Sequence, residues 1–162
     1  MKCIEKNNIM KYILFIVILV LVLLDQVVKL LADKILSKYE TLAVIPSILH
    51  LTFVKNYGAA FGILQNKRIF LLLITLAILV FIIWYLFRSN INNNLFFWSV
   101  TLIVSGGVGN FIDRLFRGYV IDYIDIRLIN FSVFNLADSY VFIGAVLVII
   151  YFIFIEPKHN SK

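Results

Sequence analysis

The residues of this chain that could carry out chemistry are concentrated in one segment, residues 106–139. Apolar runs lie on both sides of this segment. The segment itself holds carboxylates, guanidinium groups and amides: Asn110, Asp113, Arg114, Arg117, Asp122, Asp125, Arg127, Asn135 and Asp138. Ionisable side chains at the edge of a bilayer are costly to place, and they are therefore candidates for function. A catalytic or binding site is expected here.

Two of these carboxylates, Asp122 and Asp138, form the natural pair for acid–base catalysis. Two carboxyl groups at hydrogen-bonding distance share a proton, because they cannot both ionise cheaply. The ionised group is then a base that activates water, and the protonated group is an acid that protonates a carbonyl oxygen. This is the chemistry of an aspartic protease, and it needs neither a metal ion nor a covalent intermediate.

The positions of the pair suit this chemistry. Asp122 is expected in a loop and Asp138 at the start of a helix, so the two can approach each other from different elements. Asn135 is expected to cap that helix, with Asp138 in the first turn, where the helix dipole favours a carboxylate. Asn110, Arg114 and Asn135 are candidates for orienting a substrate or the carboxylates.

Three other interpretations of the same charges remain open. The first is structural, with aspartates held in salt bridges by nearby arginines: Asp113, Asp122 and Asp125 by Arg114, Arg117 and Arg127. The second is a small four-helix carrier or channel with an acidic site. Carriers tend to place coupling carboxylates near the bilayer midplane, whereas these carboxylates lie at one edge. The third is a scaffold that binds lipid or partner helices through its apolar faces.

The composition is that of a membrane protein. The chain has 162 residues, of which 62% are hydrophobic, and its net charge is +6. A soluble domain is nearer half apolar, and the cations are scattered, so nucleic-acid binding is not expected. The single cysteine, Cys3, excludes an internal disulfide. His50 and His159 are interpreted as a strand-edge residue and a tail residue, so we expect no metal site and no cofactor.

Four apolar runs are long enough to cross a membrane, which predicts an all-α integral membrane protein. A short β-branched and aromatic run at 48–54 predicts a small β-element between the first two helices. The basic start resembles a secretory signal, but no small-x-small site follows, so an uncleaved first helix is expected. We predict one membrane domain, 1–162, with helices at about 11–32, 69–87, 95–114 and 136–155, and with the segments at about 33–67 and 115–135 on the same side of the membrane.

The order of the spans determines which charged residues meet. With four spans, both termini lie on one side of the membrane, and Asp25, Asp113, Asp122 and Asp138 all fall at the other. Asp25 and Lys29 are four residues apart on one helix face, where they can form an ion pair. The run GGVGN at 106–110 favours close packing of a second helix.

The charge count does not decide the orientation in the membrane. Six of the fifteen lysines and arginines lie on the side of the termini: Lys2, Lys6, Lys11, Arg88, Lys158 and Lys162. The other nine lie on the side of the carboxylates, so the positive-inside rule would place the termini outside. The basic flank of the first helix argues for the opposite orientation. The residues alone leave the orientation open.

The sequence resembles the lipoprotein signal peptidase family, also called signal peptidase II, which are bacterial membrane aspartyl proteases. The resemblance covers nearly the whole chain after the first ten residues. It rests on five motifs in order: D-x-x-x-K at 25–29, NYGAAFG at 56–62, GGVGNFIDR at 106–114, VIDYID at 120–125 and FNLADS at 134–139. Ile121 and Tyr123 depart from the usual Val and Phe without touching the acid–base groups.

The resemblance implies Asp122 and Asp138 as catalytic residues. Asn56, Gly58, Asn110, Asp113, Arg114 and Asn135 would line or support the site, and Asp25 and Lys29 would be structural or face the substrate. The implied activity is removal of the signal peptide from a diacylglyceryl-modified prolipoprotein, just before its lipidated cysteine. The implied setting is the bacterial cytoplasmic membrane, with the termini cytoplasmic and the site at the outer leaflet. Segments 33–67 and 115–135 would then be extracytoplasmic, with 33–67 forming a small sheet against the substrate. We expect a monomer surrounded by membrane lipid.

Overall fold

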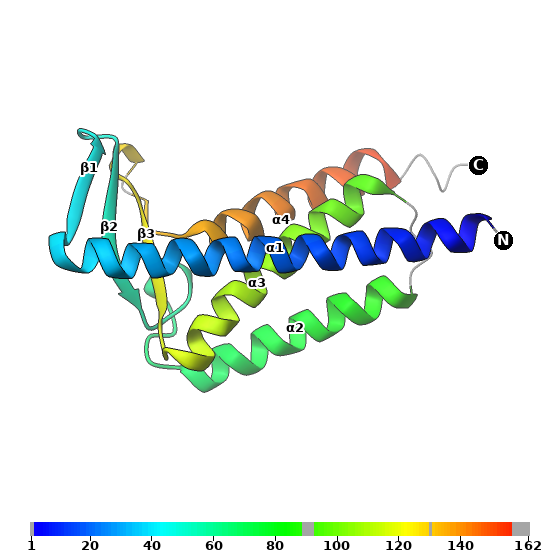
Figure 1. Ribbon diagram of the computed structural model, residues 1–162, viewed down its shortest axis with the longest axis horizontal. Coiled ribbons are helices and arrows are strands. Elements are labelled where there is room, and N and C mark those ends of the chain that lie inside the picture. Colours follow the sequence, from blue (N-terminus) through cyan, green and yellow to red (C-terminus); the bar gives the residue numbers. More distant parts are fainter. Residues whose placement is uncertain (1, 89–92, 130, 157–162) are drawn as a thin grey trace.

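Four long helices carry a small antiparallel sheet at one end (Figure 1). The computed structural model describes residues 2–88, 93–129 and 131–156, with side chains from residue 12 onward except at 87. The helices are α1 (Lys2–Tyr39), α2 (Arg68–Arg88), α3 (Asn94–Phe116) and α4 (Leu136–Phe154). The strands are β1 (Thr41–Ile45), β2 (Leu49–Asn56) and β3 (Val120–Ile126), and two 3-10 turns lie at Ala60–Gly62 and Arg127–Ile129. The start of α1 and the end of α4 lie at the opposite end of the bundle from the sheet.

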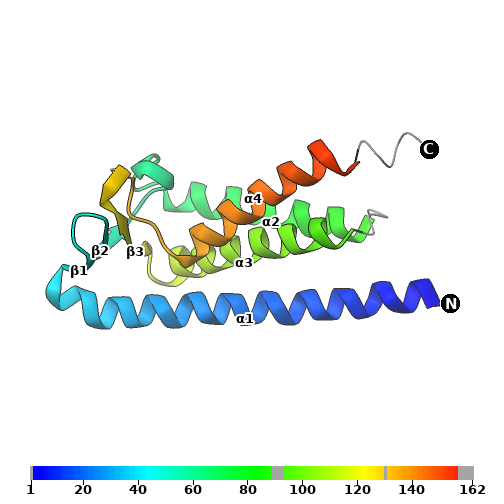
Figure 2. The same cartoon turned by 90° about the horizontal axis from the view of Figure 1, so that it is seen from above.

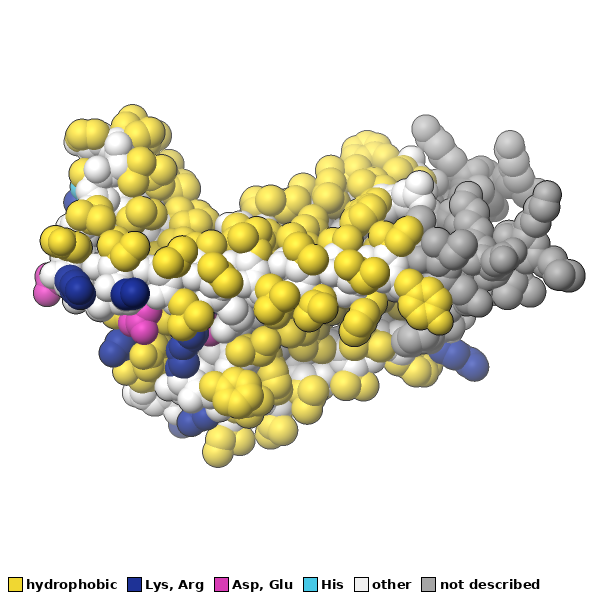
Figure 3. All heavy atoms as spheres, viewed as in Figure 1, with side chains coloured by type: hydrophobic (Ala, Val, Ile, Leu, Met, Phe, Trp, Pro, Cys, Tyr) yellow, Lys and Arg dark blue, Asp and Glu magenta, His cyan; other side chains and the backbone are white. Residues whose placement is uncertain are grey.

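The four helices have the length and composition of membrane spans, as the apolar runs predict. The shortest span has 19 residues. At the helical rise this is about 28 Å, close to the roughly 30 Å of a hydrocarbon core. Apolar side chains cover the visible surface of the helices, and most of the visible charged side chains gather at the end that carries the sheet (Figure 3). The chain is therefore a multi-pass membrane protein.

The first helix is longer than predicted. It continues to Tyr39 instead of ending near residue 32, so its last turns extend about 10 Å into the segment expected to lie outside the helix. Leu36 on this extension, and Ala32 just before it, are buried against Ile121 and Tyr123 of β3. The sheet therefore supplies an apolar surface at the end of the bundle, and this surface stabilises the extra turns.

The sheet draws strands from two separate segments of the chain. Its order is β1-β2-β3, and both pairings are antiparallel. The expectation that Asp122 lies in a loop was wrong, because Val120–Ile126 pairs with β2. Asp122 therefore lies on a strand, and His50 lies on the central strand rather than at an edge. The two aspartates in VIDYIDI obscure its strand pattern, and its partner is more than 60 residues away.

Helix α3 occupies the centre of the bundle and packs against α1, α2 and α4 (Figure 2). The predicted close approach at GGVGN is confirmed where α3 crosses α4. A Cβ atom at Gly106 would collide with the backbone carbonyl of Ala137. At Gly109 a Cβ would lie 2.5 Å from Asp25 Oδ2. The glycines therefore let α1 and α4 bring polar groups against the backbone of α3.

Candidate active site

The N-terminus of α4 is held by side chains from β3, from α1 and from its own N-cap residue, Asn135. The amide of Leu136 donates to Tyr123 Oη at 3.2 Å, and the amide of Ala137 donates to Asp25 Oδ1 at 3.0 Å. The amide of Asp138 donates to Asn135 Oδ1 at 2.9 Å, while the Asn135 amide donates to Asp138 Oδ2 at 3.2 Å. This reciprocal capping box confirms the predicted cap. Because these amides have partners on α1 and β3, the position of Asp138 is determined by the whole fold.

Asp122 is buried on β3 and accepts two hydrogen bonds from amide side chains. Asn135 Nδ2 donates to its Oδ1 at 2.6 Å, and Asn56 Nδ2, at the end of β2, donates to its Oδ2 at 2.9 Å. The Gly58 amide donates to Asn56 Oδ1 at 2.9 Å and so fixes the orientation of that amide. Burial and then the charge of Asp138 raise the pKa of Asp122 to about 6. A carboxyl group with this pKa can hold a proton close to neutral pH.

Asp138 is joined to Asp122 through Asn135. Asn135 is fully buried and contacts both carboxylates, one through its side chain and the other through its backbone amide. Asn110 on α3 donates from Nδ2 to the remaining Asp138 oxygen, Oδ1, at 2.7 Å. The structure therefore brings together the two predicted aspartates with Asn56, Asn110 and Asn135.

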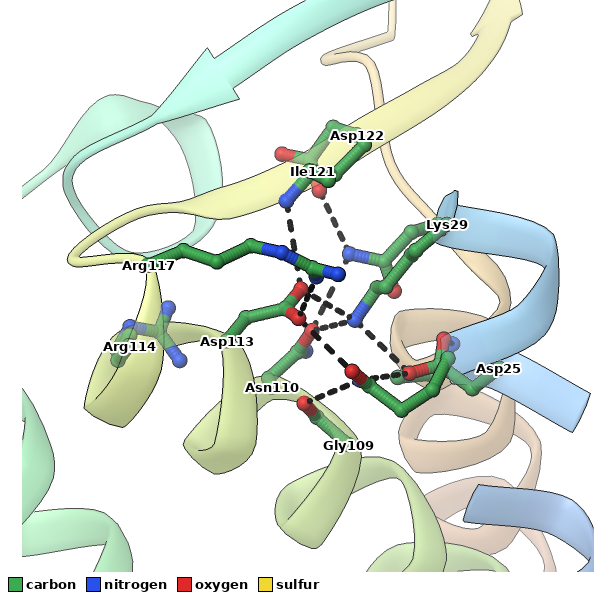
Figure 4. A network of polar contacts seen from close by, with 12 residues as sticks. Asp25, Lys29, Gly109, Asn110, Asp113, Arg114, Arg117, Ile121 and Asp122 are labelled. Carbon is green, nitrogen blue, oxygen red and sulfur yellow. Dashed lines mark hydrogen bonds and ion pairs between the residues drawn. The ribbon is translucent and has the colours of Figure 1, made fainter. Parts of the chain in front are cut away.

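A buried ion network lies between α1 and α3 beside the two aspartates (Figure 4). Lys29 Nζ is 2.9 Å from Asp25 Oδ2 and 2.9 Å from Asp113 Oδ2, and all three side chains are fully buried. The predicted Asp25–Lys29 pair is confirmed, and Arg117 also contacts Asp113 at 2.6 Å. Two cations and two carboxylates balance one another, which lowers the cost of burying them.

Gln26 belongs to this network and was missed by the sequence analysis. Its Nε2 lies 3.1 Å from the Gly109 carbonyl, 3.2 Å from Asp113 Oδ1 and 3.2 Å from Asp25 Oδ2. The available signal was its place next to Asp25 in an otherwise apolar run. Tyr123 accepts a hydrogen bond from the Leu136 amide, but the sequence analysis noted it only as a departure from the usual residue.

The predicted salt bridges are present only in part. Arg117 pairs with Asp113 and Arg127 pairs with Asp125. Among the described residues, Asp122 pairs with no arginine and its oxygens accept amide groups instead. A purely structural interpretation therefore accounts for Asp113 and Asp125 but leaves Asp122 without a cation.

Arg114 faces the two aspartates without forming a salt bridge to a carboxylate of the described chain. Its Nη2 donates to the Gly58 carbonyl at 2.9 Å, and its buried Nε has no partner in that part of the chain. The negative charges of Asp138 and Asp122 favour the positively charged form of the guanidinium. Gly58 is needed at this turn, since a Cβ there would lie 2.5 Å from the Ile63 carbonyl. Arg114 thus connects the turn after β2 to α3 at the site.

A cavity of about 180 Å³ lies beside Asp122. It is lined by Val54, Lys55, Asn56, Gly62, Gln65, Asp122, Ser132 and Val133. Its walls come from the end of β2 and the turn after it, from β3 at Asp122, and from the segment before α4. Phe61 of that turn and Phe131 of that segment pack edge to face, with ring centroids 5.4 Å apart. The sequence analysis identified only Asn56 and Asp122 among these lining residues.

Among the side chains that the structure describes, at 12–86, 88, 93–129 and 131–156, no three histidine, cysteine or acidic groups lie together so as to hold a metal ion. His50 lies in the sheet with both ring nitrogens buried, and His159 lies outside the described residues. The functional groups at the site are two carboxylates, three amides and one guanidinium, a set suited to proton transfer to and from a bound carbonyl and water.

Comparisons with known proteins identify the family. Residues 17–154 match the family model described as Signal peptidase (SPase) II. The lipoprotein signal peptidase of Halothermothrix orenii is 44% identical over 137 residues, covering 85% of this chain and 92% of that protein. The lipoprotein signal peptidase of Streptococcus agalactiae serotype Ia is 45% identical over 143 residues, covering 86% and 91%.

A solved structure agrees with the sequence relatives. A bacterial membrane enzyme determined by the in meso method at 2.3 Å superimposes with a TM-score of 0.80 and 33% identity, covering 92% of this chain and 91% of that one. A second, at 1.9 Å, has a TM-score of 0.79, also at 33% identity. On the match over residues 17–154 and these relatives, the chain belongs to the signal peptidase II family.

Proposed function

We propose that this protein is an aspartic endopeptidase that removes the signal peptide from diacylglyceryl-modified prolipoproteins, cutting just before the lipidated cysteine. Family membership supports the substrate class. The observation that carries the catalytic assignment is the bridge made by Asn135, which contacts both Asp122 and Asp138. Asp122 has a raised pKa and no cationic partner among the described residues, as expected for a group that exchanges protons.

The two carboxyl groups work with one proton between them. The ionised group removes a proton from a water molecule as the water oxygen bonds to the scissile carbonyl carbon. The protonated group gives its proton to the carbonyl oxygen, so a neutral tetrahedral diol forms. On collapse one diol hydroxyl returns its proton to the carboxylate that had protonated the carbonyl oxygen, the C–N bond breaks, and the other carboxyl group gives its proton to the amine of the lipidated cysteine. The dyad is left with one proton, as at the start. The products are a signal peptide with a free carboxyl group and a lipoprotein with a free α-amino group.

The surrounding residues position these groups. Asn56, Asn110 and Asn135 hold the carboxylate oxygens, and Gly58 orients Asn56. Arg114 has a buried Nε without a partner among the described residues, and the charges of both aspartates act on its guanidinium, so its positive charge would stabilise negative charge that develops on the substrate oxygen. Asp25, Lys29 and Asp113 support the site through the α1–α3 ion network.

The proposed setting is the bacterial cytoplasmic membrane, with the termini in the cytoplasm and the dyad at the outer leaflet. The dyad lies at the sheet end of the helices and not halfway along them, which fits a scissile bond anchored by lipid at the interface and argues against a carrier. We treat 1–162 as one membrane domain that acts as a monomer.

Cysteines placed at Lys38 and at Arg88 test the orientation. Only the cysteine at position 38 is expected to react with an impermeant reagent on intact cells. If only the cysteine at position 88 reacted, the dyad would lie on the cytoplasmic side.

The activity test is cleavage of a lipidated precursor in detergent. Asp122→Asn and Asp138→Asn should each reduce turnover by about 10³-fold or more, because an amide cannot exchange the shared proton. Asp125→Asn is the matched control, since Asp125 lies on the same strand but pairs with Arg127. It should retain turnover. Near-normal turnover by either dyad variant would exclude the catalytic assignment.

A further inference from the structure

Lys29 makes a contact that its ion pairs do not explain. Besides Asp25 and Asp113, its ammonium donates to Asn110 Oδ1 at 2.9 Å, so all three donors are in use (Figure 4). An ammonium group has no acceptor, so the atom of Asn110 that faces it must be the oxygen. Lys29 therefore determines which way the amide of Asn110 points.

The second donor at Asn110 reinforces this direction. Asn135 Nδ2 also approaches Asn110 Oδ1, at 3.2 Å. A flipped Asn110 would turn its own NH₂ group toward an ammonium and another NH₂ group in a buried site, which is unfavourable. The Asn110 Nδ2 is thereby directed at Asp138 Oδ1, 2.7 Å away. A chain of donors runs one way from Lys29 through Asn110 to Asp138.

Asp138 is better placed than Asp122 to carry the negative charge. Its two oxygens accept the Asn110 side chain and the Asn135 backbone amide, and it lies in the first turn of α4, where the helix dipole stabilises an anion. Asp122 lies on a strand and has no helix dipole. The charged and titratable groups near Asp138 are Lys29 of α1, Arg114 of α3, and Asp122 and Tyr123 of β3, with Asp25 and Asp113 paired to Lys29.

We propose that Lys29 is a positioning residue that acts through Asn110 to keep Asp138 the ionised member of the dyad. Asp138 is then the general base that takes the proton from water, and Asp122 holds the proton that passes to the substrate carbonyl oxygen. This inference rests on the proposed peptidase function. It assigns the base role to one carboxyl group and the acid role to the other, whereas the two carboxylates alone could exchange these roles.

Two double variants separate this role from a structural ion pair. Asp25→Asn/Lys29→Met and Asp25→Asn/Lys29→Gln each remove one positive and one negative charge, so the buried network stays balanced. Both keep an oxygen at position 25 for the Ala137 amide. Only the glutamine variant retains a side-chain donor for Asn110 Oδ1. Each variant is compared with the wild type by thermal midpoint in detergent and by the pH profile of cleavage.

The methionine variant should lose about 100-fold in kcat, the size expected when a catalytic group is misplaced by about 1 Å. Its acidic limb should move about one unit to higher pH, because the base has lost a hydrogen bond to its ionised form. The glutamine variant should keep the acidic limb of the wild-type pH profile and lose less than about tenfold in kcat, since the donor to Asn110 is retained. Identical profiles and turnover in the two variants would overturn the positioning role.

Asn110→Asp keeps the proposal testable if neither double variant folds, because it leaves the Lys29 ion pairs in place. A carboxyl group at position 110 donates to Asp138 only when it is protonated, so the pH optimum should move to lower pH. An unchanged optimum would overturn the donor chain. Failure of the proposed function is seen separately, as activity retained by Asp122→Asn. Failure of this inference leaves that variant inactive.

Discussion

Replacing Asn135 tests whether the site depends on more than a helix cap. In Asn135→Ala the Asp138 amide loses its acceptor, which costs about 1 kcal/mol of stability, as for other caps. The same change removes the donor to Asp122 Oδ1 at 2.6 Å and the contact to Asn110 Oδ1 at 3.2 Å. Leaving these buried acceptors without their donor costs about 1–3 kcal/mol, so turnover should fall about 5- to 150-fold beyond any loss of folded protein.

Asn93→Ala is the matched control for this experiment. Asn93 caps α3 through its side chain, which accepts from the Phe96 amide at 3.2 Å, and it lies at the opposite end of the bundle from the sheet. Both variants should lower the thermal midpoint in detergent, Asn135→Ala by more because it also loses the contacts to Asp122 and Asn110. Only Asn135→Ala should lower kcat per folded molecule. An equal effect of the two variants on kcat would show that Asn135 acts only as a cap.

Three further predictions concern pH, metal ions and helix packing. The pKa of Asp122 is raised to about 6 from an ordinary 3.8. The folded state therefore holds this proton where the unfolded chain has lost it. Its contribution to stability is full below about pH 4 and is lost as the pH rises through about 6. Asp122→Asn should consequently be more stable than the wild type at pH 8, by at most about 3 kcal/mol, with no difference at pH 3.5, as measured by thermal midpoints. EDTA should leave cleavage unchanged, and a loss restored by a divalent ion would contradict the dyad chemistry. Gly106→Ala should cost about 1–3 kcal/mol and displace α4, because the new Cβ meets the Ala137 carbonyl. Gly107→Ala is the control for it, since the Cβ there meets only the flexible Leu79 side chain at 3.1 Å, and equal thermal midpoints for the two variants would contradict the packing argument.

Features that depend on neighbouring residues were visible in the sequence. The four spans follow from unbroken apolar runs, because a helix in a bilayer needs only length and hydrophobicity. The Asp25–Lys29 pair follows from the i,i+4 spacing on one helix face, and the capping box of Asn135 and Asp138 follows from a three-residue spacing. The convergence of the carboxylates at one end of the bundle follows from the order of the spans.

The contacts that build the site join residues far apart in the chain, and no local pattern encodes them. Asn56 reaches Asp122 across 66 positions, Lys29 reaches Asn110 across 81, and the Ala137 amide reaches Asp25 across 112. The strand β3 was missed for the same reason, because a strand is defined by its partner and its two aspartates interrupt the apolar alternation. Gln26 showed no motif of its own, and only the approach of α3 at Gly109 gives its amide three acceptors. The identity of the chemical groups was therefore readable in the sequence, whereas the direction of each hydrogen bond depends on helices and strands that meet only after the chain has folded.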